Sequence, residues 1–184
     1  MLERTLVGHC APTLANLKTA NLFGYRTEGA QPLQEQLSQV RSQLLPRGVE
    51  LRLLEHRSGR ALIYVYRIRR LCRDLADPEI RLFLRECGYR DFSVAGALDH
   101  LARRIAEQGG DFPHEIGLFL GYPLGDVKGF IEHRGQNCLC TGCWKVYCDE
   151  REARKQFCRF EKCRSVYCRL YREGQALSRL TVAA

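Results

Sequence analysis

The sequence predicts an α+β fold: a single domain in which a small mixed sheet of four strands is packed by about six helices. Segments with apolar residues at helical spacing alternate along the chain with short segments of strand character. Proline, glycine, serine and aspartate residues separate these segments at positions typical of helix starts and stops. A length of 184 residues and an apolar fraction of 45% are enough for one compact core.

The first third of the chain is expected to hold two helices and two strands. One helix begins at Pro12, because proline fits the first helical turn, and ends at residues 21–24. A second helix begins at Pro32 and carries a single apolar stripe. Residues 49–53 alternate in polarity like a strand with one wet face, and residues 61–66 are apolar throughout, which predicts a central strand.

Two further helices and a third strand are predicted in the middle of the chain. Asp77 followed by Pro78 is a strong helix start, and Ser93 is suited to cap the next helix. Residues 113–123 alternate between large apolar residues and glycine or phenylalanine, which predicts a strand. Glycine in such a strand allows another element or a ligand to approach the backbone closely.

The last part of the chain is expected to end in a long basic helix. Residues 124–133 predict a helix, and residues 144–147 predict a short fourth strand. Asp149 and Glu152 form a capping box for a helix that reaches about residue 172. The domain is therefore expected to cover residues 1–173, and residues 174–184 are expected to form a flexible tail.

Composition narrows the expected environment of the protein. The chain has no apolar run long enough for a membrane span, and its start lacks the apolar core of a secretion signal. Ten cysteines in a chain of this length are expected to be reduced thiols in the cytoplasm, because disulfide scaffolds belong to short secreted proteins. The sequence thus predicts a cytoplasmic, cysteine-rich protein, with some thiols available for metal binding.

The first candidate site combines Cys10 with a histidine from elsewhere in the chain. A thiol at the start of a helix beginning at Pro12 would lie beside unpaired N–H groups, which stabilise a thiolate. His114 and Glu115, at the start of the predicted third strand, are the candidate base and its orienting group. The same atoms, with His9, are donors suited to iron, including haem, or to zinc. Cys10, His114 and Glu115 are therefore candidate catalytic residues, and Cys10, His9 and His114 candidate metal ligands.

A second candidate metal site lies among the seven cysteines between residues 138 and 168. Cys140 and Cys143 have the spacing of a zinc knuckle, and Cys138 and Cys163 are the candidate further ligands. Helical geometry points the cysteines of the last helix in three directions, so one ion cannot collect them all. Scattered reduced thiols, a zinc or iron–sulfur site, and a redox pair at Cys140 and Cys143 remain open.

The basic last helix raises the question of nucleic-acid binding. Residues 151–173 hold eight lysines and arginines against three glutamates, and the chain as a whole carries a net charge of +8. Such a helix attracts phosphate backbones. Its aromatic residues fall on the predicted packed face, where they cannot stack on bases. A solvated helix face is the preferred interpretation.

Several blocks of the sequence resemble an uncharacterised bacterial family, a domain of unknown function found chiefly in anaerobic Firmicutes. The blocks are His9-Cys10-Ala11-Pro12-Thr13-Leu14-Ala15, Pro113-His114-Glu115-Ile116-Gly117-Leu118-Phe119-Leu120-Gly121-Tyr122-Pro123 and Gly142-Cys143-Trp144-Lys145-Val146-Tyr147. The resemblance implies iron or anaerobic redox physiology, with flavodoxin-type electron carriers or iron-uptake components as partners. The chain departs from the family pattern at Asn16 and Cys143, which weakens Cys143 as an obligatory ligand.

Three functions therefore remain open at the level of sequence. The first is thiol or metal chemistry linked to iron or redox physiology, through Cys10 and the His114-Glu115 block. The second is a thiol hydrolase or transferase in which Cys10 and His114 act as in papain-like enzymes. The third is a nucleic-acid-binding module that uses the helix at residues 151–172. Whether the protein is an enzyme stays open.

Overall fold

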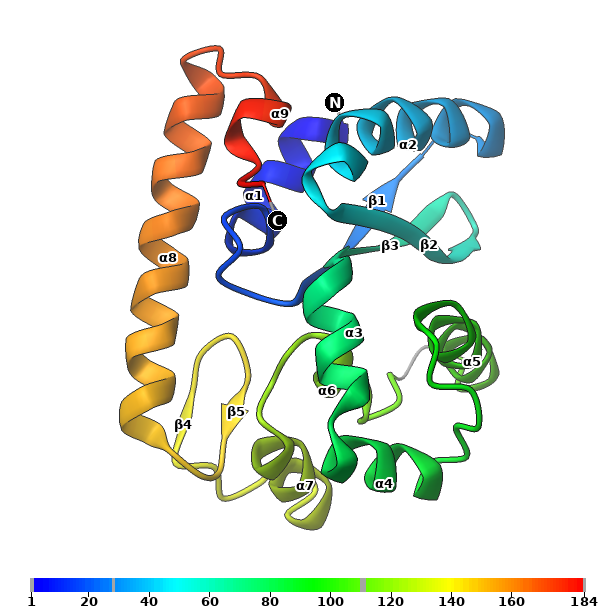
Figure 1. Cartoon of the computed structure of the whole chain (residues 1–184), viewed down its shortest axis with the longest axis vertical. Helices are drawn as coiled ribbons and strands as arrows, with labels where there is room; N and C mark the ends of the chain where they lie inside the picture. The colour runs from blue at the N-terminus through cyan, green and yellow to red at the C-terminus, as the bar shows by residue number, and fades with distance from the viewer. Residues whose placement is uncertain (1, 28, 110–111, 184) are drawn as a thin grey trace.

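The computed structural model describes residues 2–27, 29–109 and 112–183, and it has the mixed α+β character that the sequence predicts. A three-stranded antiparallel sheet lies among helices, and the long helix α8 runs along one side of the molecule (Figure 1). The elements are α1 (Leu2–Leu14), β1 (Ala20–Arg26), α2 (Ala30–Leu44), a 3₁₀ turn (Leu45–Arg47), β2 (Val49–Arg57), β3 (Arg60–Arg67), α3 (Ile68–Ala76), α4 (Pro78–Glu86), α5 (Val94–Glu107), α6 (Ile116–Phe119), α7 (Leu124–Glu132), β4 (Cys140–Thr141), β5 (Lys145–Val146), α8 (Glu150–Arg172) and α9 (Leu177–Leu180).

The central strand β3 divides the core into two parts. Successive side chains of a strand point to opposite faces. Ile63 and Val65 accordingly pack into a cluster with α1, α2 and α9, whereas Tyr64 and Tyr66 pack into a second cluster with α3, α4, α5, α6 and α7. The prediction that residues 61–66 form a central strand is confirmed, because β3 lies between β1 and β2. Both faces of the strand are buried, which explains its continuous apolar run.

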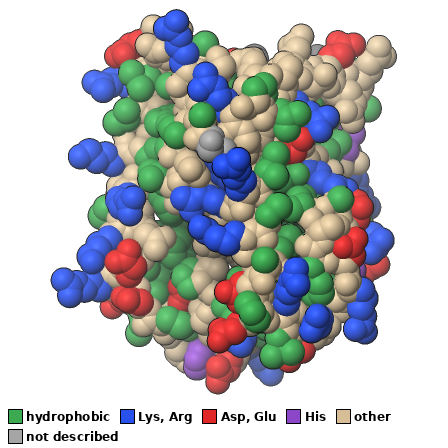
Figure 2. Space-filling model, viewed as in Figure 1, with side chains coloured by type: hydrophobic (Ala, Val, Ile, Leu, Met, Phe, Trp, Pro, Cys, Tyr) green, Lys and Arg blue, Asp and Glu red, His purple; other side chains and the backbone are tan. Residues whose placement is uncertain are grey.

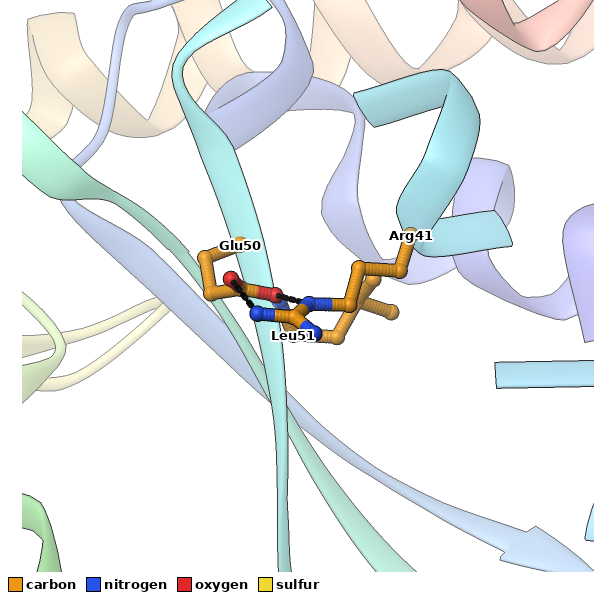
Figure 3. A network of polar contacts seen from close by, with 3 residues as sticks. All are labelled: Arg41, Glu50 and Leu51. Carbon is orange, nitrogen blue, oxygen red and sulfur yellow. Dashed lines mark hydrogen bonds and ion pairs between the residues drawn. The ribbon is translucent and has the colours of Figure 1, made fainter. Parts of the chain in front are cut away.

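The strands β2 and β3 and the helix α2 were predicted, and the structure pairs the two strands in a hairpin and ties α2 to it. Leu33, Val40 and Leu44 form the buried stripe of α2. Arg41 donates from Nε and from one terminal nitrogen to the two carboxylate oxygens of Glu50 on β2, each at 2.7 Å (Figure 3). Such a two-point contact fixes the helix over the sheet more firmly than a single ion pair would.

Helix α1 corrects the predicted start of the fold. It begins at Leu2 rather than Pro12, because Leu2, Leu6, Val7 and Leu14 form an apolar stripe that is buried against the sheet and α8. Pro12 lies in the last turn, and its carbonyl accepts the backbone N–H groups of residues 17 and 18 at 2.8 and 3.2 Å. The prediction that places Cys10 at a helix N-terminus is therefore wrong.

Strand β1 is a second correction, since the sequence predicted a helix end and a loop there. Residues 20–26 pair with β3 in antiparallel register, with Ala20 opposite Tyr66 and Arg26 opposite Arg60. Phe23 is buried in the cluster that contains α1. The pairing partner lies about forty residues away in the chain, so the local sequence carries little sign of it.

The predicted strand at residues 113–123 is the third correction. Residues 116–119 form the short helix α6, and all four of these residues are buried. A Cβ added at Gly117 would lie 2.8 Å from Val127 of α7 and 3.1 Å from Tyr122, so the glycine allows α6 to pack closely. Gly121 closes the turn with a φ of 77°, a value that glycine adopts without strain.

The sheets also differ from the four-stranded mixed sheet that was predicted. β5 pairs with β4 in a separate two-stranded antiparallel sheet, and β1, β3 and β2 form the other. At the C-terminal end, where a flexible tail was expected, α9 buries Leu177 and Leu180 against α2 and α8. These two leucines join the same core cluster as α1.

The capped starts of α4, α5 and α8 were predicted correctly. Asp77 accepts the backbone N–H groups of residues 79 and 80, Ser93 accepts that of residue 96, and Asp149 accepts that of residue 152. Each cap satisfies N–H groups that a helix leaves unpaired at its start. Among the residues described, no helix has both the length and the apolar character needed to cross a membrane.

Candidate functional site

The surface is hollowed beside the loop that joins α1 to β1, and both basic and acidic side chains line this hollow. We call it the polar cleft; it has a volume of about 660 Å³. Figure 2 shows Lys and Arg side chains gathered around a hollow near the middle of the face. The charged residues that line the cleft are Lys18 on the loop, Arg70, Arg73, Asp74, Asp77 and Glu79 on and after α3, and Arg159 on α8.

Lys18 is the most unusual residue of the polar cleft. Its side chain is only 7% exposed, and its ammonium lies 5.0 Å from the centre of the Tyr122 ring. Within the described part of the chain, no carboxylate lies within ion-pair distance of this ammonium. Burial lowers the pKa of Lys18 to about 8, and the nearby Cys143 and Cys10 thiols oppose this shift only in part.

The loop geometry explains why Lys18 lies inside the molecule. The backbone N–H groups of Leu17 and Lys18 both donate to the Pro12 carbonyl, which holds the loop against the end of α1. Asn16 adopts a left-handed conformation with φ of 56°, which asparagine tolerates better than most residues. The Asn16 side chain then accepts from Nε of Arg70 at 2.7 Å. One short loop thus places a buried lysine and fixes an arginine at the same cleft.

Asp74, which contacts the residue next to Lys18, is already engaged. The Thr19 hydroxyl donates to Asp74 Oδ2 at 2.6 Å, and Arg73 lies 3.5 Å from Asp74 Oδ1. At the other end of the cleft, Asp77 caps α4. Lys18 and Arg159 are left without an acidic partner among the residues described. The cleft can therefore offer positive charge to a ligand.

A second hollow of about 790 Å³ lies on the other side of Tyr122 and Trp144, and we call it the apolar cavity. Tyr122 and Trp144 stack with ring centres 4.8 Å apart and line both hollows. The residues that line the apolar cavity are Gln108, Phe112, Pro113, His114, Ile116, Gly117, Tyr122, Asp126, Val127, Phe130, Trp144 and Lys145.

Asp126 anchors the wall between the two hollows. Its Oδ2 accepts from the indole Nε1 of Trp144 at 2.7 Å, and its Oδ1 accepts the backbone N–H groups of Tyr147 and Cys148 at 2.8 and 2.9 Å. The carboxylate is 3% exposed. Three donors stabilise the buried charge, so Asp126 holds the β4–β5 hairpin against α7.

The structure places Cys10 in an environment that does not suit the reactive role suggested by the sequence. Its side chain is fully buried among leucine and valine side chains of the core, and burial raises the pKa of its thiol. Neighbouring cations, Lys18 and Arg164, oppose this shift only weakly. A nucleophilic cysteine requires the opposite change and access to solvent. The structure therefore removes the premise on which Cys10 was chosen as a reactive thiol.

The other members of that predicted site are not gathered around Cys10. His114 is exposed and lines the apolar cavity, where its ring meets Phe130 edge-on at 5.2 Å. Glu115 is 2% exposed, pairs with Arg104 at 2.5 Å and accepts from the Tyr89 hydroxyl at 3.3 Å. His9 is exposed and stacks on Phe23. Cys10 is not among the residues that line the apolar cavity.

The predicted metal ligands are also not assembled into a site. Cys138, Cys140, Cys143 and Cys163 are all free thiols, and the nearest polar contact of Cys138 is the Thr141 hydroxyl at 3.4 Å. Across residues 2–27, 29–109 and 112–183, no three His, Cys, Asp or Glu side chains are arranged to hold a metal ion. Iron, zinc and redox chemistry thus gain no support from these residues.

The basic helix has the arrangement that the sequence predicted. Ala153 and Phe160 are its buried residues, and Phe157 packs edge-on against Trp144. The lysines and arginines of residues 151–172 are exposed. Two of them are neutralised within the helix, because Arg154 pairs with Glu150 at 2.7 Å and Lys155 with Glu152 at 3.4 Å.

The residues of the polar cleft were missed by sequence reasoning. Lys18, Arg70 and Arg159 lie on three elements that are far apart in the chain, and no spacing rule connects them. Lys18 carried no local signal, because residues 12–24 were predicted to be helical and the burial of a lysine depends on the fold around it. Lysine is almost never fully buried unless it is paired.

No curated protein and no solved structure matches this chain. Residues 6–181 match the model of a family described as "Protein of unknown function (DUF3793)", and the chain therefore belongs to that family, as the resemblance predicted.

Proposed function

We propose that this protein binds a small, multiply anionic molecule, bearing phosphate or carboxylate groups, in the polar cleft. The observation that carries the proposal is the buried ammonium of Lys18, which lines the cleft without a carboxylate in ion-pair reach among the described residues. A bound anion would supply that missing partner.

Energetics favour a functional role for Lys18 over a structural one. A buried charge without a partner destabilises a fold, and apolar residues of similar size are often better tolerated at such positions. Lys18 donates no hydrogen bond to a described carboxylate that would offset this cost. Destabilising groups of this kind are typical of binding and catalytic sites.

The surrounding arginines suit an anion with several charged oxygens. Arg70 is held in place by Asn16, whereas the Arg73 side chain is 71% exposed and can move toward a ligand. Arg159 belongs to α8, whereas Arg70 and Arg73 belong to α3, so two separate helices bring arginines to the cleft. Guanidinium groups bind phosphate and carboxylate oxygens in pairs, while the lysine contributes a compact charge. The volume of about 660 Å³ is in the range of small-molecule sites.

The acidic residues of the cleft restrict which anions fit. Asp77 and Glu79 line the end near α4, so that end repels additional negative charge. A molecule with its anionic groups toward Lys18 and its hydroxyl or amino groups toward α4 matches this distribution. We therefore favour phosphorylated or carboxylated metabolites over long polyanions.

Calorimetric titration with inorganic pyrophosphate and with citrate tests the proposal. We expect saturable binding with one site per chain, weakened at least tenfold in Lys18→Met, because hydrogen bonds to charged groups contribute about 1.5–3 kcal/mol. Lys162→Met is the matched control, since Lys162 is an exposed lysine of α8 that does not line the cleft. Equal affinities of the two variants, or no saturable binding of either anion, would refute the proposed function.

A further inference from the structure

The apolar cavity has a different chemistry from the polar cleft. Four aromatic side chains line it, those of Phe112, Tyr122, Phe130 and Trp144, together with aliphatic side chains from α6 and α7. Its volume of about 790 Å³ falls in the range of small-molecule sites, which are mostly apolar with a few placed polar groups.

The polar groups of the cavity gather around one ring. The Lys145 ammonium lies 5.9 Å from the centre of the Phe130 ring, and the His114 ring lies 5.2 Å from it. Lys145 uses one of its three donors on the carbonyl of Gly135, at 2.7 Å. Two donors of this ammonium therefore remain for a ligand at the edge of the apolar surface.

Asp126 lines the cavity, but its carboxylate is already hydrogen-bonded and does not favour a cationic ligand. Asp126 accepts from three donors, and all of them come from the β4–β5 hairpin and the residues that follow it. Its charge is thereby compensated inside the wall. Among the described residues that line the cavity, Lys145 therefore offers the charge that a ligand can pair with.

From this arrangement we infer that the apolar cavity is a second binding site, which takes an amphipathic organic anion: an aromatic or aliphatic body with one carboxylate, sulfonate or phosphate group. The body lies against Tyr122, Phe130 and Trp144, and the anionic group meets Lys145, with His114 as a further hydrogen-bonding partner. The inference does not depend on ligand binding in the polar cleft, although the two hollows share the wall of Tyr122 and Trp144.

The probe for this site is 8-anilinonaphthalene-1-sulfonate, which has an aromatic body and a single sulfonate. We expect one saturable site per chain by probe fluorescence, with circular dichroism confirming that the protein stays folded. Lys145→Met is expected to weaken binding about tenfold or more, and Lys145→Arg to retain most of it. Phe130→Ala removes apolar contact without changing charge and is expected to weaken binding as well.

Two controls separate this site from general charge effects. Lys128→Met removes an exposed lysine of α7 that does not line the cavity, and it is expected to leave the affinity unchanged. Lys162→Met removes an exposed lysine of α8 that lines neither hollow, and it is likewise expected to leave the affinity unchanged. The inference is overturned if Lys145→Met binds like Lys128→Met, if Lys162→Met weakens binding as much as Lys145→Met, or if binding is not saturable.

Discussion

Replacing Lys18 by methionine is expected to stabilise the ligand-free protein. The pKa of Lys18 is about 8, against an ordinary value of 10.5, and this difference corresponds to about 3 kcal/mol. That amount is the cost of keeping the charged form in the buried site below pH 8. Methionine fills a similar volume without a charge, so Lys18→Met removes this cost. Imperfect packing of the methionine offsets only part of the resulting gain in stability.

The expected gain at pH 7 is about 1–3 kcal/mol, or a rise in Tm of roughly 3–10 °C for a chain of this size. Chemical denaturation and thermal melting in phosphate-free buffer measure it. Lys162→Met, the exposed control, is expected to stay within about 0.5 kcal/mol of the wild type.

The dependence on pH gives the prediction its sharpest test. Between pH 8 and 10.5 the native state releases the Lys18 proton while the unfolded state keeps it, so wild-type stability gains from rising pH in this window. Lys18→Met lacks this contribution. Its advantage over the wild type should therefore shrink from pH 8 upward and vanish near pH 10.5. A variant that is less stable than the wild type at pH 7, or a difference that does not change with pH, would refute the reasoning.

The remaining predictions concern ligand affinity, thiol reactivity and two buried charges. The affinity for pyrophosphate in calorimetry is expected to fall by up to tenfold per pH unit above about pH 8, as Lys18 loses its proton, and a flat profile from pH 8 to 9 would count against its role. Cys10 is expected to react with iodoacetamide at least a hundredfold more slowly than the exposed Cys143 in the native protein, as measured by peptide mass spectrometry; comparable rates would contradict its burial. Arg67→Met is expected to lower the free energy of unfolding by about 3 kcal/mol, because the buried guanidinium donates to four backbone carbonyls, and a loss below about 1 kcal/mol in urea would contradict that role. Asp126→Leu is expected to cost about 3 kcal/mol in the same assay, since three donors lose their acceptor, and unchanged emission of the sole tryptophan in this variant would argue against the indole contact.

Elements with strong local signals were predicted from sequence because their physical cause is local. Asp77, Ser93 and Asp149 satisfy N–H groups two or three residues further on, so the pattern is present in the chain itself. The hairpin of β2 and β3 is equally local, since its strands are joined by a short turn.

Elements that depend on distant partners were predicted wrongly. β1 exists because β3 offers a pairing edge, and a sequence window around residues 20–26 does not contain that edge. Pro12 indicated a helix start by its own preference, but the apolar stripe that begins at Leu2 buries more surface and sets the helix. In residues 113–123 the alternation of large apolar residues with glycine or phenylalanine indicated a strand, whereas the structure buries all four residues of the short helix α6.

The amino-acid sequence by itself determined the α+β class, the caps of the main helices, the central hairpin and the basic character of α8, because each follows from spacing and composition within one segment. Only the tertiary structure decided that Cys10 is fully buried in the core, and that the buried Lys18 lines the same cleft as Arg70 and Arg159. The pKa of a thiol or an ammonium depends on solvent exposure and on charges brought near by folding. Those quantities are properties of the folded chain, so the candidate site could be recognised only there.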